Sequence, residues 1–190
     1  MAEDTRRQGF EGLTTFDPGG GMAAWAAPPA GQVVIRASVG DVDALAGKLG
    51  FALAASSNLA NTDGDVTTFR LGPDQWLAVH DTDARFGRDL EDMVGVHALD
   101  QTSSRARLRL RGAASRDLLA VGAAIDLKPK AFPAGAFAQT TVGNATAVLH
   151  AREADLFDAY IARSFAQSWL AWLCHAGREF DLRIAGEASD

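Results

Sequence analysis

The chain has 190 residues, of which 47% are hydrophobic and 22% are charged, and these proportions are typical of a folded globular protein rather than a disordered one. The formal net charge of −6 argues against nucleic acid or an anionic membrane as the main partner, because both attract clustered positive charge. The single cysteine, Cys174, excludes an internal disulfide, and the first residues lack the apolar segment of a secretory signal. We therefore expect a cytoplasmic protein.

Residues 1–31 predict an extended N-terminal arm. The segment is rich in proline and contains three consecutive glycines, with no sustained hydrophobic period. No strand precedes the glycines, so they do not form a dinucleotide-binding fingerprint. The scattered apolar side chains of the arm need a surface, and we expect them to lie on a partner. These side chains are Phe10, Leu13, Phe16 and Trp25. At the other end, residues 181–190 predict a flexible tail.

The first half of the folded region predicts a strand, a helix, a hairpin and a second helix. The strand covers 33–38, and the helix covers 41–49 with Asp41 as its N-cap and Gly50 at its end. A polar loop over 56–65 follows. Strands over 67–71 and 75–80 are joined by the turn residues Gly72, Pro73 and Asp74, and a helix capped by Thr82 or Asp83 ends near Gly95.

The second half repeats this order. We expect a strand over 106–111, a helix over 113–121, a hairpin over 136–142 and 146–151, a strand over 157–161 and a last helix over 165–176. Each half has its hairpin at nearly the same distance from its first strand. The segment WLAVHD at 76–81 is also similar to TAVLHA at 146–151. The pattern predicts an α+β fold with a largely antiparallel sheet. Residues 32–180 would form one compact domain of two similar halves, 32–95 and 105–177, each a strand-helix-hairpin-helix unit.

The last helix has the clearest signals. Ser164 and Gln167 match a capping box, which would start the helix at Phe165. Gly177 would end it in the left-handed conformation. The apolar stripe indicates a core-facing helix, although a partner could also cover part of it. The stripe consists of Phe165, Trp169, Trp172, Leu173 and Ala176. The preceding strand alternates around Asp158 and Tyr160 and predicts a half-buried strand.

No catalytic or metal site emerges from these residues. The histidines show no metal-ligand spacing, and Cys174 has no second cysteine to form a metal or redox motif. We interpret His80 and His150 as structural and Cys174 as a small buried side chain. The histidines are His80, His97, His150 and His175.

Four arginines alternate with apolar residues along one predicted strand. Their guanidinium groups would all lie on the same face. One interpretation is a solvated face with carboxylates nearby. The other is an interface or anion-binding face, because arginine suits bidentate pairing with carboxylates. The four are Arg105, Arg107, Arg109 and Arg111.

Three stretches resemble the gamma subunit of heterotetrameric sarcosine oxidase. They are LGPDQWLAV at 71–79, DQTSSRARLRLRGAASRDLLAVGAAIDL at 100–127 and ARSFAQSWLAWLCHAG at 162–177. The resemblance covers roughly residues 33–177. It implies an aminomethyltransferase-like fold, similar to the tetrahydrofolate-binding proteins of glycine cleavage.

The resemblance also implies an accessory role. Larger alpha and beta subunits would carry the FAD, FMN, NAD and tetrahydrofolate sites, and a small zinc-binding delta subunit would complete the complex. The chain itself would hold no cofactor and would have no activity alone. The motif residues that carry over are interpreted as structural or interfacial, and they are Gly72, Pro73, Trp76, Arg163, Ser164 and Phe165.

Other functions stay open at this point. Related demethylases such as N-methylglutamate dehydrogenase use a similar gamma-type subunit, and nothing here selects the amine. A stand-alone folate-binding protein, with the pterin between the two halves, is an alternative from another class. A homo-oligomeric scaffold is a third.

Overall fold

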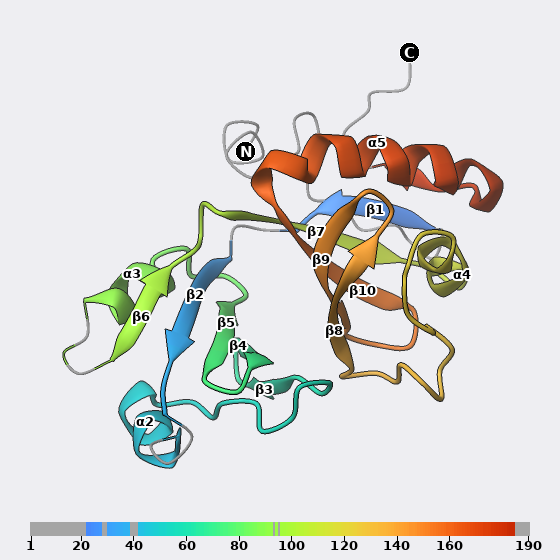
Figure 1. Ribbon diagram of the computed structural model, residues 1–190. Coiled ribbons are helices and arrows are strands. Elements are labelled where there is room, and N and C mark those ends of the chain that lie inside the picture. Colours follow the sequence, from blue (N-terminus) through green and yellow to red (C-terminus); the bar gives the residue numbers. More distant parts are fainter. Residues whose placement is uncertain (1–21, 28–29, 39–41, 93, 95, 185–190) are drawn as a thin grey trace. The chain divides into compact units, whose positions relative to one another are not determined.

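The computed structural model describes residues 22–27, 30–38, 42–92, 94 and 96–184, and these fall into two compact units (Figure 1). The continuous unit is a single run of chain, 30–103. The composite unit combines 22–27 with 104–184. The expected N-cap Asp41, the expected helix end at Gly95 and most of the arm and tail lie outside the described residues.

The continuous unit has one five-stranded antiparallel sheet and two helices. Its elements are β2 (Gly31–Arg36), α2 (Val42–Leu49), β3 (Asn61–Asp63), β4 (Val66–Gly72), β5 (Gln75–His80), α3 (Phe86–Glu91) and β6 (His97–Asp100). The sheet order is β3-β4-β5-β2-β6. The β4–β5 hairpin confirms the predicted turn, and Gly50 ends α2 with a φ of 76°, as a left-handed C′ glycine does. Strands β3 and β6 have no counterpart among the elements predicted from the sequence.

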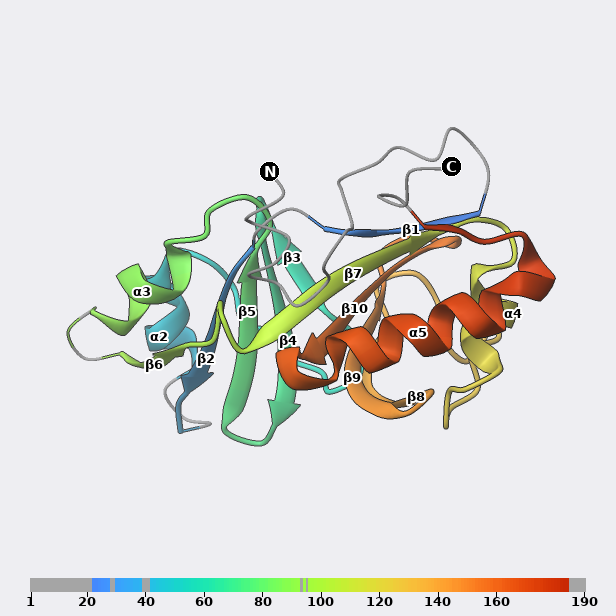
Figure 2. The ribbon, with the colours of Figure 1, turned by 90° about the horizontal axis from the view of Figure 1, so that it is seen from above.

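The composite unit has a six-stranded sheet and two α-helices, of which α5 is the longer. Its elements are β1 (Ala23–Ala26), β7 (Arg105–Arg111), α4 (Ser115–Ala120), β8 (Phe137–Val142), β9 (Ala145–Ala151), β10 (Leu156–Ala162), α5 (Ala166–Gly177) and β11 (Arg183–Ile184). The order is β11-β1-β7-β10-β9-β8, antiparallel except for the β1–β11 pair. In Figures 1 and 2 α5 lies against this sheet. Side chains from α4 and α5 pack with the sheet into one hydrophobic core.

Both units follow the same chain path, a split β-α-β-β-α-β arrangement with one extra strand beside the hairpin. In this path β2, β4, β5 and β6 correspond to β7, β9, β10 and β11, and β1 is inserted between β7 and β11. The similar segments WLAVHD and TAVLHA are therefore not equivalent, because they lie on β5 and β9. The counterpart of β5 is β10.

The ends of the described chain differ from the expected arm and tail. Residues 23–26, assigned to the arm, form β1 and pair with β7, and Trp25 is only 8% exposed. Residues 183 and 184, assigned to the tail, pair with β1. No local pattern signals these strands, because they are short and their partners are distant in the chain.

The start of α5 corrects the capping-box prediction. Ala162 is the last residue with an extended backbone (φ −55°, ψ 131°), and residues 163–165 form a 3₁₀ turn before α5. Ser164 is already inside the helical run, so it comes too late to cap it. The N-cap position of α5 is Phe165, which makes no side-chain cap hydrogen bond.

The end of α5 is displaced as well. Gly177 keeps a helical backbone (φ −70°), and the chain continues through a 3₁₀ turn to Asp181, which takes the left-handed conformation (φ 51°). Aspartate tolerates this conformation better than most residues. Gly177 is needed for space instead, because a Cβ there would lie 2.7 Å from Leu182 Cβ.

Candidate functional site

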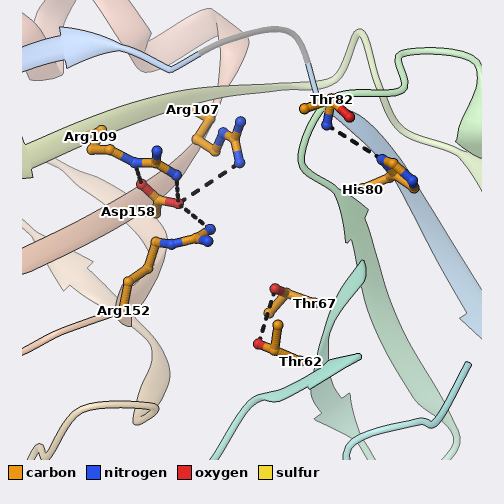
Figure 3. A network of polar contacts seen from close by, with 8 residues as sticks. All are labelled: Thr62, Thr67, His80, Thr82, Arg107, Arg109, Arg152 and Asp158. Carbon is orange, nitrogen blue, oxygen red and sulfur yellow. Dashed lines mark hydrogen bonds and ion pairs between the residues drawn. The ribbon is translucent and has the colours of Figure 1, made fainter. Parts of the chain in front are cut away.

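The most concentrated buried charge in the composite unit surrounds Asp158, in the middle of β10 (Figure 3). Arg109 on the neighbouring strand β7 donates two hydrogen bonds, Nε to Oδ1 at 2.7 Å and Nη2 to Oδ2 at 2.8 Å. Arg152, just after β9, donates from Nη1 to Oδ2 at 3.2 Å. Arg107 Nη1 lies 3.8 Å from the same oxygen. Three guanidinium groups thus converge on one carboxylate.

The strand register creates this arrangement. Asp158 is paired directly with Arg109 on β7 and with His150 on β9. Side chains on one face of β7 recur every second residue, so Arg107 and Arg109 reach the same carboxylate. The Asp158 side chain is fully buried and Arg107 is 2% exposed.

Two opposing effects act on the pKa of Asp158. Burial alone would raise it, since a buried carboxylate loses its hydration. The hydrogen bonds from Arg109 and the charges of Arg107, Arg109 and Arg152 more than offset burial and hold the pKa well below its ordinary value. Asp158 is therefore ionised throughout the physiological pH range.

The four arginines of β7 therefore form neither a fully solvated face nor a face that is simply exposed to a partner. Arg107 and Arg109 bind the chain's own aspartate, and Arg111 pairs with Glu153 at 3.1 Å, an exposed contact. Burial lowers the pKa of Arg105. The alternating apolar residues Ala106, Leu108 and Leu110 do face the core, as the alternation predicted.

Asp158 and Arg152 are not among the site residues predicted from the sequence. The predicted strand was expected to be half-buried, but β10 is buried on both faces from Leu156 to Ile161. The available signal was a lone carboxylate among apolar residues in FDAYIA, which a strand tolerates only when a cation accompanies the carboxylate.

The turn motif of the continuous unit is held by Arg70. Its guanidinium donates to the carbonyl oxygens of Gly72 (3.4 Å) and Pro73 (3.0 Å) and lies over the Trp76 ring, 5.5 Å from the centroid. Trp76 is 1% exposed and donates from Nε1 to the Ala54 carbonyl at 2.8 Å. Gly72, Pro73 and Trp76 thus meet around one arginine that the sequence analysis did not single out.

The aromatic stripe of α5 is divided between core and surface. Trp169 is fully buried and donates from Nε1 to the Val142 carbonyl at 2.9 Å. Trp172 is partly buried and packs against Trp169, with ring centroids 5.7 Å apart. Phe165 is 50% exposed, and Arg163 and Ser164 are exposed too. The structure does not gather these residues around a reactive group.

Two further polar contacts support a turn and a strand pair in the continuous unit. His80 Nδ1 accepts hydrogen bonds from the backbone N–H groups of Thr82 and Asp83, at 3.4 and 3.1 Å, and so closes the turn between β5 and α3. Thr62 and Thr67 join β3 to β4 through their hydroxyls, 3.2 Å apart (Figure 3). Among the described residues no group of three or more histidine, cysteine or carboxylate side chains could hold a metal ion. No helix in that part of the chain is long and apolar enough to cross a membrane.

The fold is similar to two kinds of solved structure. A chain of heterotetrameric sarcosine oxidase from Corynebacterium sp. U-96, in complex with pyrrole 2-carboxylate, matches with a TM-score of 0.77 and 24% identity over 88% of each chain. The glycine cleavage system aminomethyltransferase T from Bartonella henselae matches with a TM-score of 0.59 and 12% identity. That match covers 88% of this chain but 48% of the aminomethyltransferase. Curated protein sequences give no match.

These likenesses define the class as an α+β protein with two mostly antiparallel sheets and an aminomethyltransferase-like fold. The model of the sarcosine oxidase gamma subunit family matches residues 36–179, well over half of the chain. The chain belongs to the sarcosine oxidase gamma subunit family.

Proposed function

We propose that the chain is a non-catalytic gamma subunit that supports the assembly and stability of a heterotetrameric, sarcosine oxidase-type flavoenzyme complex. In this proposal larger alpha and beta subunits and a small delta subunit perform the oxidative demethylation of sarcosine in the cytoplasm. FAD, FMN, NAD, tetrahydrofolate and zinc would all be bound by those partners. Membership of the gamma subunit family supports the proposal.

The permanent ionisation of the Asp158 carboxylate is the main observation in support of a non-catalytic role. A general acid or base must exchange a proton near the working pH. The pKa of Asp158 lies far below that range, and both of its oxygens already accept hydrogen bonds from arginines. The most strongly perturbed carboxylate in the described chain is therefore suited to hold β7 and β10 together, and not to transfer protons.

The family motifs support the same role. In the G-P-x-x-W turn the Pro73 carbonyl accepts a hydrogen bond from Arg70, and Trp76 donates one to the Ala54 carbonyl. In α5, Trp169 donates one to the Val142 carbonyl. These contacts stabilise the chain's own units. Phe165, half-exposed just before α5, and Trp172, partly buried within α5, are large apolar residues that a partner could cover.

Co-expression of this chain with candidate alpha, beta and delta subunits tests the proposal. Omitting the chain should reduce the yield and melting temperature of the complex, while turnover per remaining assembled complex should stay nearly constant. A yellow isolated chain, or sarcosine oxidation by the isolated chain, would contradict the proposal. Saturable folate binding by the isolated chain would favour the folate-binding alternative. Comparing sarcosine with N-methylglutamate as substrates of the assembled complex identifies the amine.

A further inference from the structure

A hollow in the continuous unit is lined by three basic side chains from three different elements. Arg36 ends β2, His97 begins β6 and Lys48 lies in the last turn of α2. In Figure 1 the end of β2 lies beside α2. The hollow has a volume of about 330 Å³, at the lower end of the roughly 300–1,000 Å³ typical of small-molecule sites. Its other lining residues are Ala37, Ser38, Ala44 and Leu45.

The sheet register places two of these groups face to face. Arg36 and His97 are direct partners across the antiparallel β2–β6 pair. An anion between these two side chains could accept a hydrogen bond from each of them.

The hydrogen-bond donors of the hollow are available to a ligand. The side chains of Lys48 and His97 make no hydrogen bond or ion pair with any residue that the structure describes. Arg36 donates from Nη2 to Gln75 Oε1 at 3.1 Å, while its ion pair with Asp74 is long, at 3.9 Å. Both side chains of that pair are mostly exposed, at 63% and 59%, so solvent weakens it.

The net charge of the whole chain does not explain why three basic side chains gather around this hollow. The whole chain carries a net charge of −6, so a gathering of three basic groups is a local exception to its acidic character. The apolar side of the hollow, Ala37, Ala44 and Leu45, adds a surface that a bare inorganic ion would not use.

We propose that this hollow binds a small organic anion. Its carboxylate or phosphate group pairs with Arg36, Lys48 and His97, and its apolar part lies against Ala44 and Leu45. The arginine fork suits bidentate contact with either kind of group, and lysine adds a point charge. The site is separate from the assembly role proposed above and does not depend on it.

Titration of the full-length chain with phosphate and, separately, with benzoate tests the site. We expect saturable binding in backbone amide NMR spectra, with shifts confined to the residues that line the hollow. Lys48→Gln and His97→Gln should each weaken binding at least five-fold, whereas Lys48→Arg should retain most of it. Tighter binding of phosphate would point to a phosphorylated ligand, and tighter binding of benzoate to a carboxylate with an apolar body.

Lys130→Gln is the matched control, because Lys130 is also an exposed lysine but lies in the composite unit. This variant should bind both probes like the unaltered chain. Equal weakening by Lys130→Gln would mean general charge attraction and would overturn the proposal. Absence of saturable binding of both probes would overturn it too. If the Lys48 and His97 variants then also failed to co-purify with the larger subunits, the hollow would be a docking site for an acidic partner segment.

Discussion

The indole ring of Trp172 lies directly on the backbone of Gly143, in the turn between β8 and β9. A Cβ added to Gly143 would lie 2.7 Å from Trp172 Cε3, closer than side-chain carbons approach. Gly143 also has a φ of 62°, which side chains rarely adopt. Glycine is thus required here for two independent reasons, the close approach of the Trp172 ring and the positive φ.

Replacing Gly143 by alanine should destabilise the chain through both reasons. Gly135→Ala is the matched control, since Gly135 has a φ of 83° with nothing within 4 Å of the added Cβ. The control should lose about 1–2 kcal/mol from backbone strain alone. Gly143→Ala should lose at least about 1 kcal/mol more because of the overpacked ring. Urea unfolding measures the difference, and equal losses would show that the ring moves aside freely.

Replacing Trp172 by alanine should cost the isolated chain about 2–3 kcal/mol. This is below the ~3–5 kcal/mol expected for a fully buried tryptophan, because Trp172 is only partly buried. Trp169→Ala, at a fully buried position, should cost more and serves as the reference. Melting of the isolated chain and of the assembled complex should be compared. A variant that melts normally alone while its complex dissociates would place Trp172 in the interface instead.

Replacing Ser164 by alanine should leave stability within about 0.5 kcal/mol of the unaltered chain, as is usual for exposed positions. The reason is that Ser164 lies within the 3₁₀ turn and not at the cap of α5. Thermal unfolding of the isolated chain checks this result. A loss near 1 kcal/mol, the usual contribution of a serine cap, would restore the capping box that the sequence suggested.

Replacing Asp158 by asparagine should destabilise the chain by about 3–5 kcal/mol, because Arg107, Arg109 and Arg152 would keep their charges without a buried carboxylate. Glu153→Gln, which removes only the exposed pair with Arg111, should cost less than about 1 kcal/mol. Denaturant unfolding of the two variants gives the comparison. Similar small losses would mean that the arginines relax into solvent.

The same aspartate predicts how stability depends on pH. Its pKa in the folded chain is lower than its ordinary value of 3.8, so the folded state favours the ionised form. The resulting stabilisation is fully present above the unfolded pKa and is lost as the pH falls below about 4 toward the folded value. Unfolding measured between pH 6 and pH 3 should therefore show a steeper loss for the unaltered chain than for Asp158→Asn. Parallel profiles would contradict this assignment.

Two N-terminal deletions separate the roles of the first residues. Deleting 1–21 leaves β1 in place, and it should weaken co-purification with the larger subunits while the isolated chain melts normally. Deleting 1–27 also removes β1 with Trp25, exposes the edge of β7 and should lower the melting temperature of the isolated chain. Normal co-purification after the first deletion would show that residues 1–21 do not lie on a partner.

Features with local signals could be predicted from the sequence. The turn residues Gly72-Pro73-Asp74 predict the β4–β5 hairpin, and Gly143-Asn144 predict the β8–β9 hairpin. Both hairpins form as expected. The alternation along β7 correctly placed Ala106, Leu108 and Leu110 toward the core. In each case the residues that decide the structure are neighbours in the chain.

Features that depend on distant partners could not be predicted. Asp158 is matched to Arg109 by strand register, across a separation of 49 residues, and its alternating neighbours indicated only a half-buried strand. Ser164 fitted a cap motif, yet the extended backbone ends at Ala162 and the helical turn begins one residue later. Strands β1 and β11 were missed because β1 pairs with β7 and β11 pairs with β1. No local sequence pattern indicates such long-range pairing.

The pairing of β1 with β11 has a consequence for synthesis of the protein. One sheet needs residues from both ends of the described chain, since Ala23 pairs with Arg183 and Ala24 with Ile184. The described strands of the continuous unit all lie before Arg105, so this unit can fold before β11 has been synthesised. Strand β1 must then wait for β11, and the sheet of the composite unit can close only after the whole continuous unit has been made.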